Sequence, residues 1–292
     1  HISALAQSMG YELQVIGVPK TIDNDLAVTD HSPGYGSAAR FMALAARDAG
    51  LDLEAMATFE DVSILEAMGR NAGWLAAASS LAKASDEDAP HLVYIPEQTF
   101  DENRFLDSVS KVHSRLQRVF VVVCEGGCDA SGDFVGSSRM KETRDAFGHT
   151  LNTFTTGVAA YLAETVSEKL GLRARFLRPV IIGRAMSACV SETDRQEAYQ
   201  VGQEAVKQLA GDQTGLMITL HRVSSAPYAC ETGIAPLKQV ANAEKLLPQN
   251  FYDTHQNMPN ANFKAYALPL VGEAWQPAIR LTKKRVPPLA SA

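Results

Sequence analysis

Residues 13–25, Leu-Gln-Val-Ile-Gly-Val-Pro-Lys-Thr-Ile-Asp-Asn-Asp, set a pattern that the rest of the chain repeats. The apolar run 13–18 predicts a buried strand, and Pro19 ends it because proline cannot donate a hydrogen bond to a sheet. One lysine, one threonine and two carboxylates follow: Lys20, Thr21, Asp23 and Asp25. In open α/β sheets ligands bind beyond the carboxyl ends of strands, so this loop is a candidate site. A plain polar turn is the alternative interpretation.

A second strand with a polar end follows at residues 62–67, Val-Ser-Ile-Leu-Glu-Ala. It leads into a turn, Met68-Gly69-Arg70-Asn71-Ala72-Gly73, and then into an alanine-rich helix that we expect to run to about residue 84. An arginine at the start of a helix opposes the helix dipole, so Arg70 fits better as a ligand for a carboxylate or phosphate. An exposed, solubilising arginine is the alternative.

The next strands are predicted at residues 91–95, which Pro96 ends, and at residues 118–124. An amphipathic helix over 102–117 separates them. The second of these strands ends at Glu125-Gly126-Gly127, and a carboxylate in that place suits a hydrogen bond to a ligand hydroxyl. The alternative is a turn in which Glu125 caps a local backbone group.

Strands alternate with helices over most of the chain, which is typical of a mostly parallel sheet with helices on both faces. Residues 129–150 are polar and predict a surface excursion, with a change of lobe near 126–150. Residues 221–292 predict an irregular wrap. The remaining expected elements are helices over 1–10, 37–49, 155–170, 191–211 and 237–246, and strands over 173–184 and 216–220.

The expected strand over 173–184 carries four arginines: Arg173, Arg175, Arg178 and Arg184. Charge on an otherwise apolar segment is costly unless it is paired or faces a ligand. Such arginines are typical of sites for phosphorylated sugars, and equally of subunit interfaces and edge strands.

Composition narrows the class of protein. The 292 residues include 46% apolar and 21% charged residues, with a net charge of −6, as in soluble globular proteins. Without clustered Lys and Arg, nucleic acid is not an expected partner. No apolar run reaches the length of a membrane span, and no secretory signal is visible. The four cysteines predict free thiols in a reducing cytoplasm, and Cys124 with Cys128 lacks the second ligand pair that zinc needs.

Taken together, these motifs resemble the phosphofructokinase family. The resemblance covers nearly the whole chain. It is carried by Pro19-Lys20-Thr21-Ile22-Asp23-Asn24-Asp25, Met68-Gly69-Arg70, Ala72-Gly73-Trp74-Leu75, Tyr94-Ile95-Pro96-Glu97, Glu125-Gly126, Arg175, Arg184, the pattern Asp194–Ala198–Gly202–Val206, Tyr228-Ala229-Cys230-Glu231-Thr232-Gly233 and Ala241-Asn242-Ala243-Glu244-Lys245. Lys20, where ATP-dependent bacterial members tend to have glycine, and the late Ala-Asn-x-x-Lys are similar to the pyrophosphate-dependent group.

The resemblance implies a Rossmann-like α/β fold with two similar lobes. Residues 1–125 would form the remainder of an incomplete first lobe, and residues 126–292 would form the second lobe with the C-terminal wrap. The chain starts at His1 without a methionine and close to a strand, so we expect an upstream part that carries the family's glycine-rich donor loops.

The resemblance also implies a role for each matching residue. Asp23 would be the base for the sugar's 1-hydroxyl, and Thr21 would hold that part of the sugar. Lys20 would contact the phosphoryl donor, and Asp25 would order Asp23 or the magnesium–phosphate cluster. The fructose 6-phosphate site would be formed by Met68, Gly69, Arg70 and Glu125, with Arg175 and Arg184 on the 6-phosphate, one of them reaching a neighbouring subunit's site.

The implied activity is phosphoryl transfer from pyrophosphate to fructose 6-phosphate, giving fructose 1,6-bisphosphate in glycolysis, with Mg²⁺, in a cytoplasmic dimer or tetramer. An ATP-dependent 6-phosphofructokinase and a non-catalytic sugar-phosphate-binding subunit are the alternatives. Besides the expected upstream part, the chain departs from the family's pattern in two places. Asp61 stands near the position of a neighbour-reaching arginine, and Ile182-Gly183-Arg184 replaces Leu-Gln-Arg.

Overall fold

The structure is a computed structural model that describes residues 2–137, 141–144, 150–153 and 157–279. Its helices are α1 (Ile2–Ser8), α2 (Tyr35–Ala55), α3 (Trp74–Ala78), α4 (Glu102–Leu116), α5 (Val158–Leu170), α6 (Ile181–Ala185), α7 (Glu192–Ala210), α8 (Leu237–Val240) and α9 (Ala261–Ala267). Its strands are β1 (Ile16–Gly17), β2 (Val62–Ala67), β3 (Leu92–Tyr94), β4 (Val119–Cys124), β5 (Lys141–Arg144), β6 (Thr150–Thr153), β7 (Ala174–Leu177), β8 (Leu216–Ser225), β9 (Tyr228–Pro236), β10 (Tyr252–Asp253) and β11 (Met258–Pro259).

A four-stranded parallel sheet, in the order β3-β4-β2-β7, forms the larger part of the molecule. Every residue of β2 and β4 is buried, as expected of strands covered on both faces. One face packs against α2 and α3, and the other against α4 and α5. The predicted α/β class, a parallel sheet flanked by helices, is therefore confirmed.

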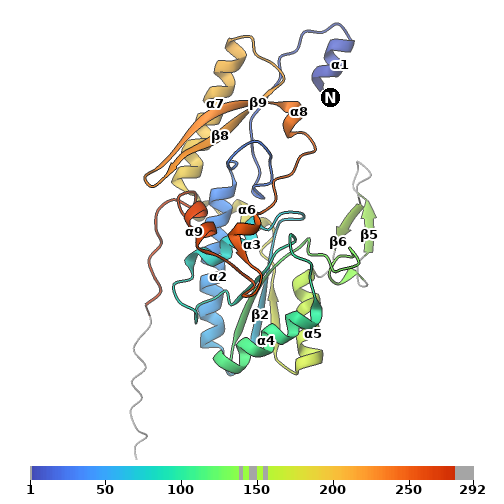
Figure 1. The fold of residues 1–292 in the computed structure, drawn as a ribbon, viewed down its shortest axis with the longest axis vertical. Helices are drawn as coiled ribbons and strands as arrows, with labels where there is room; N and C mark the ends of the chain where they lie inside the picture. The colour runs from blue at the N-terminus through green and yellow to red at the C-terminus, as the bar shows by residue number, and fades with distance from the viewer. Residues whose placement is uncertain (1, 138–140, 145–149, 154–156, 280–292) are drawn as a thin grey trace, which may run out of the picture.

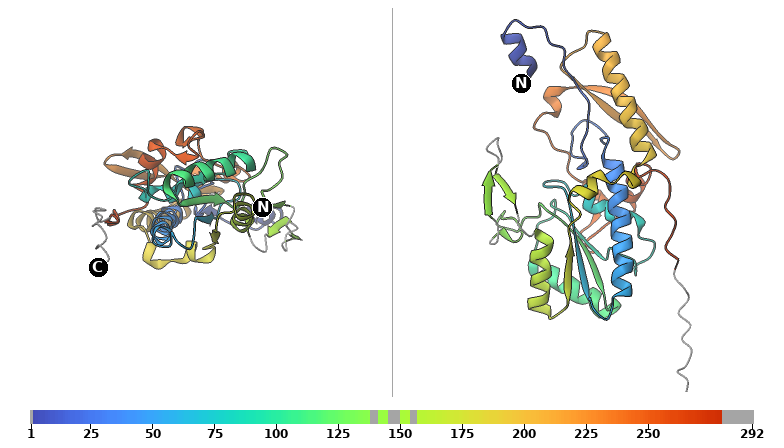
Figure 2. Two further views of the ribbon diagram at one scale, coloured as in Figure 1. Left: turned by 90° about the horizontal axis from the view of Figure 1, so that it is seen from below. Right: turned by 180° about the vertical axis from the view of Figure 1, so that it is seen from behind.

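A smaller sheet, in the order β1-β8-β9, lies at the other end of the molecule's long axis (Figure 1). Its strand β1 pairs with β8 in parallel, β8 and β9 form an antiparallel hairpin, and α7 packs against it. The right view of Figure 2 also shows this sheet apart from the larger one, with α2 and the segment after β9 running from one toward the other. Each sheet contains strands from both sides of residue 125, so a division of the chain there does not separate the two sheets.

Three stretches differ from the sequence-based expectation. The buried strand predicted over 13–18 is reduced to the two-residue β1, which is only partly buried, and Leu13 and Val18 are 39% and 50% exposed. The strand predicted over 173–184 stops at Leu177, because Pro179 has no N–H to donate to a sheet, and the chain then turns into α6. Where an irregular wrap is predicted after residue 220, the chain continues β8 and turns back as β9, which places Cys230 opposite Arg222 and Tyr228 opposite Ser225. The expected surface excursion contains the hairpin of β5 and β6. Across the described residues, no helix has the length and apolar character needed to cross a bilayer.

Candidate functional site

The carboxyl edge of the large sheet brings together two of the predicted motifs. Ala67 and Cys124 are paired neighbours at the ends of β2 and β4, so Met68 and Glu125 leave the sheet side by side. The Gly69 N–H donates to Glu125 Oε1 at 3.4 Å, and the Cys124 thiol donates to the Gly69 carbonyl at 3.0 Å. The Met68–Arg70 turn and Glu125 thus form one backbone-linked unit.

Two glycines make this unit possible. Gly69 has φ +125°, a backbone conformation that residues with a side chain rarely adopt. A Cβ added to Gly69 would also lie 2.5 Å from the Ala72 carbonyl oxygen. A Cβ on Gly126 would lie 1.5 Å from the carbonyl oxygen of Arg70. Only glycine at position 126 allows the two turns to approach this closely.

The loop after β1 is held by backbone and side chains from elsewhere in the chain. Thr21 forms an isolated parallel β-bridge with Gly34, and its side-chain Oγ1 accepts a hydrogen bond from the Asp23 N–H at 3.1 Å. The buried carboxylate of Asp194, on α7, accepts from the N–H groups of Gly34 at 2.7 Å and Ser37 at 3.1 Å. Asp194 therefore caps the start of α2 and fixes the turn against which Thr21 lies.

Asp23 has the chemistry expected of a base. Burial raises the pKa of Asp23 to about 6, with further contributions from Asp25 and Glu125, while Lys20 and Arg70 oppose the rise. Among the described residues, Asp23 Oδ1 is buried without a hydrogen-bond partner. The four predicted residues that act on this pKa, Lys20, Asp25, Arg70 and Glu125, come from three separate segments. The structure therefore gathers residues 20–34 (the base loop, named for the role expected of Asp23), the Met68–Arg70 turn and Glu125 around one carboxylate.

Glu125 lies in the same acidic setting. Burial raises the pKa of Glu125, and the charge of Glu66 adds to that rise, whereas the Gly69 N–H and the charge of Arg70 lower it. A buried oxygen that already accepts one backbone N–H retains further acceptor capacity for a hydroxyl of a bound molecule.

An open hollow of about 380 Å³ lies beside the base loop. Lys20, Gly34 and Asp194 line it on one side, and Arg184 with Met186 on the other. Two exposed cations, Lys20 and Arg184, thus face one space that an anion could enter.

The other three arginines of the basic segment are ion-paired at the sheet. Arg173 pairs with Asp61 at 2.6 Å, Arg175 with Glu60 at 2.9 Å and Arg178 with Glu66 at 2.6 Å. Arg175 pairs in register with Ser63, near the amino end of β2, so it lies ~16 Å along the strand from the Met68–Arg70 turn. Within one chain, Arg175 is not brought together with the other predicted site residues.

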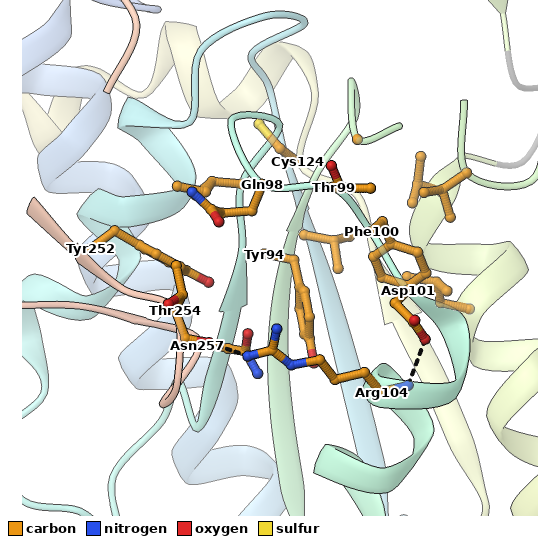
Figure 3. Close-up of a pocket in the computed structure, with 16 residues that line it drawn as sticks. Tyr94, Gln98, Thr99, Phe100, Asp101, Arg104, Cys124, Tyr252, Thr254 and Asn257 are labelled. Atoms are coloured by element: carbon orange, nitrogen blue, oxygen red, sulfur yellow. Dashed lines mark hydrogen bonds between the residues drawn. The ribbon is translucent and has the colours of Figure 1, made fainter. Parts of the chain in front are cut away.

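A second hollow lies at the carboxyl ends of β3 and β4, on the side of α4 (Figure 3). It has a volume of about 50 Å³ and is lined by the rings of Tyr94, Phe100 and Tyr252 together with Arg104. It contains none of the predicted site residues, although Cys124 in its wall directly precedes Glu125.

A buried polar cluster connects the end of the base loop, at Asp30 and His31, to α7 and β9. His31 Nδ1 lies 2.8 Å from Asp30 and Nε2 lies 2.6 Å from Glu197, whose other oxygen accepts from the Tyr228 hydroxyl at 2.5 Å. Burial lowers the pKa of His31, but the hydrogen bonds with the two carboxylates outweigh it and raise the pKa. Cys230 lies close enough to form a possible set of three metal ligands with His31 and Glu197. However, His31 Nε2 and Glu197 Oε2 are 2.6 Å apart, which is a hydrogen-bond distance, whereas two ligand atoms on one zinc ion lie ~3.3 Å apart. The cluster therefore fits a hydrogen-bonded network better than a zinc site.

Several residues that shape the site were not assigned a role from the sequence. Glu97 accepts from Gly73 at 2.9 Å and from Leu247 at 2.7 Å, and Tyr266 accepts from the Asn24 amide at 3.0 Å. Lys245 contacts the loop at Asn24 and Asp30. Glu97 and Lys245 stand in motifs that the resemblance singled out, so the signal was present, but only the fold shows what they touch.

Comparison with known proteins agrees with this arrangement. A sequence profile described as Phosphofructokinase matches residues 1–209. The chain belongs to the phosphofructokinase family. It is 42% identical over 275 residues to the pyrophosphate–fructose 6-phosphate 1-phosphotransferase of Xanthomonas campestris, covering 94% of this chain and 65% of that protein. The Rhodospirillum rubrum protein of the same name is 38% identical over 287 residues, with 98% of this chain and 70% of that protein covered.

A solved structure is similar as well. The pyrophosphate-dependent phosphofructokinase of Nitrosospira multiformis superposes with a TM-score of 0.81 at 35% identity, covering 96% of this chain and 65% of that one. The chain thus spans about two thirds of the length of the relatives it matches, and the activity of a complete protein is taken up next as a proposal.

Proposed function

We propose that this chain carries the sugar-phosphate site and the catalytic base of a diphosphate–fructose-6-phosphate 1-phosphotransferase. The observation that carries the proposal is the Asp23 carboxylate. It is buried, its Oδ1 has no hydrogen-bond partner among the described residues, and the cations Lys20 and Arg70 act on it. A pKa of about 6 leaves Asp23 ionised at neutral pH and able to accept a proton.

In the proposed reaction, Asp23 takes the proton from the 1-hydroxyl of fructose 6-phosphate. The freed oxygen forms a bond to the terminal phosphorus of pyrophosphate, the bridging P–O bond breaks, and inorganic phosphate leaves. Thr21 orients the sugar, and Lys20 binds the donor and the moving phosphoryl group, whose charge must be compensated. The acceptor is held by Met68, Gly69, Arg70 and Glu125.

The donor assignment rests on Lys20 and on the names of the similar proteins. Pyrophosphate has no base or ribose to bind, so cations must provide its recognition. Lys20 is exposed at the mouth of the hollow that it shares with Arg184, which suits contact with an anion.

The residues present fit a divalent cation. Asp23 Oδ1 is a buried oxygen without a partner in the described part of the chain, and the carboxylate of Asp25 is close enough to raise the pKa of Asp23. Mg²⁺ prefers carboxylate oxygens, and we propose that Asp25 holds it. When bound, the ion would neutralise charge on the phosphoryl oxygens.

We further propose that the protein is a homo-oligomer in which Arg175 serves a neighbouring chain, while Arg184 binds the 6-phosphate. Arg175 lies on the edge strand β7 at the far end of the sheet from its own chain's site. The segment that follows exposes apolar side chains, each between 38% and 61% exposed: Phe176, Leu177, Val180, Ile181, Ile182, Met186 and Val190. An apolar surface of this kind marks an interaction site. A monomeric mass in sedimentation equilibrium would contradict this proposal.

The test is an assay of the longest protein that carries this chain, with fructose 6-phosphate and either pyrophosphate or ATP. We expect turnover with pyrophosphate, and activity with ATP alone would overturn the donor assignment. Asp23→Asn should lower kcat by about 10²–10⁴-fold, the usual contribution of a positioned base. Asp52→Asn, which changes an exposed carboxylate on α2, is the matched control. Unchanged turnover of the Asp23 variant would refute its role.

A further inference from the structure

A short segment after β9, residues 244–247, runs between the two halves of the candidate site, which are the base loop and the sheet edge with the Met68–Arg70 turn and Glu125. Its Lys245 N–H donates to the Asp25 carbonyl at 2.7 Å, and its Lys245 carbonyl accepts from Trp74 Nε1 at 2.9 Å. Glu244 bridges to Leu26 and accepts from the Asn71 amide at 2.6 Å. The segment therefore contacts the base loop on one side and the Arg70 turn with its helix on the other.

The side chain of Lys245 points into the base loop. Its Nζ lies 2.7 Å from the Asp30 carbonyl, 3.3 Å from the Thr29 carbonyl and 3.2 Å from Asn24 Oδ1. The ammonium also lies 5.1 Å from the centre of the Trp74 ring. Three acceptors use all three donors of an ammonium group, so Lys245 has no N–H left for a substrate.

Asn24 shows what these contacts hold in place. It is fully buried between Asp23 and Asp25, and its φ of 55° is left-handed, which is uncommon for a residue other than glycine. Its oxygen accepts from Lys245 and its amide donates to the Tyr266 hydroxyl at 3.0 Å. These contacts anchor the backbone between Asp23 and Asp25, the two carboxylates expected at the site.

We propose that Lys245 is a positioning residue that holds the Asp23–Asp25 loop in register with the Met68–Arg70 turn. This inference rests on the proposed function for its catalytic consequence. Burial lowers the pKa of Lys245 to about 8, consistent with an ammonium that is largely removed from solvent. The position of a base matters because a displacement of ~1 Å can cost about 100-fold in rate.

The test compares Lys245→Met, which keeps the chain length without the donors, with Lys238→Met, an exposed lysine in the same part of the chain. Two measurements are made: steady-state kinetics, and hydrogen exchange of peptides that cover residues 20–30. For Lys245→Met we expect kcat to fall about 30–100-fold with the KM for fructose 6-phosphate within about threefold, and faster exchange in residues 20–30 alone. Lys238→Met should match the parent in both.

A raised KM with unchanged kcat would overturn the proposal, because it would place Lys245 on the substrate. Unchanged exchange in residues 20–30 would also overturn it. If Lys245→Met does not fold, Lys245→Gln, whose amide offers two N–H donors and no positive charge, replaces it, with the same outcomes in weaker form. Absence of turnover in the parent protein would refute the proposed function, while the exchange measurement would still decide whether Lys245 holds the loop.

Discussion

The two halves of the candidate site are built in different ways. Met68–Arg70 and Glu125 leave neighbouring parallel strands, and hydrogen bonds across the sheet edge hold them together. The base loop, residues 20–34, has almost no regular structure of its own and is held by three residues far along the chain, Asp194, Lys245 and Tyr266. The first half depends on close backbone approach, and the second on buried polar contacts, so different substitutions should damage each.

The largest effect is expected at the sheet edge. Gly126→Ala places a methyl group where the Arg70 carbonyl lies, so one of the two turns must move. We expect a loss of about 1–3 kcal/mol in the free energy of unfolding and about 100-fold in kcat/KM.

Gly127→Ala is the matched control, because a Cβ there would meet its nearest neighbour at 3.7 Å, an ordinary contact. Denaturant unfolding and kinetics of both variants make the comparison. Equal behaviour of the two would show that the sheet-edge half does not depend on this approach.

A smaller effect, on the free energy of unfolding, is expected at the His31 cluster that connects the base loop to α7. Because the pKa of His31 is higher in the folded protein than its ordinary value of 6.5, the charged form is favoured by folding. That stabilisation is fully present below about pH 6.5 and is lost as the pH rises through the folded-state pKa. His31→Gln should therefore cost about 2 kcal/mol near pH 6, and progressively less at higher pH.

Urea unfolding at a series of pH values from 5.5 to 9 measures this difference, with the exposed His255→Gln as control. The pKa of the partner Asp30 is lowered in the folded state, so its own contribution is lost only in acid, below this range. A cost for His31→Gln that stays constant, or grows as the pH rises, would contradict the assignment.

The smallest effect concerns the electrostatic link between the two halves. If Asp23 is the base, kcat/KM should rise with pH through a value near 6, where its carboxyl loses its proton. Glu125 contributes to the raised pKa of Asp23, so Glu125→Gln should move this acid limb to lower pH. The midpoint is read from the pH profile and is independent of the lower absolute activity that this variant will have.

Lys20→Met is the opposite control, because Lys20 lowers the pKa of Asp23 and its removal should move the limb to higher pH. If the acid limb of kcat/KM had the same midpoint in the parent, Glu125→Gln and Lys20→Met proteins, neither residue would act on the titrating group. The pH profile would then give no support to Asp23 as the base.

Local pattern predicted the sheet-edge half well. The apolar run before Met68 becomes β2 with the predicted bounds, and the run before Glu125 becomes β4 within one residue. The reason is that a buried parallel strand is a continuous apolar run, and the polar residues that follow must lie at its carboxyl end. The pattern failed where a proline interrupts the run, so Arg175 and Arg184, predicted on one strand, lie on β7 and in α6.

The sequence by itself determined the α/β class, the strand ends that carry polar residues, and the motifs that mark the family. These follow from hydrophobic periodicity and from residue types whose conformational limits act locally. Only the tertiary structure decided that Lys245 and Asp194 hold the base loop, that Gly126 must have no side chain, and that Arg175 lies far from its own chain's site. Those facts depend on contacts between residues more than fifty positions apart, or on the register of β7, and no local pattern of the chain contains them.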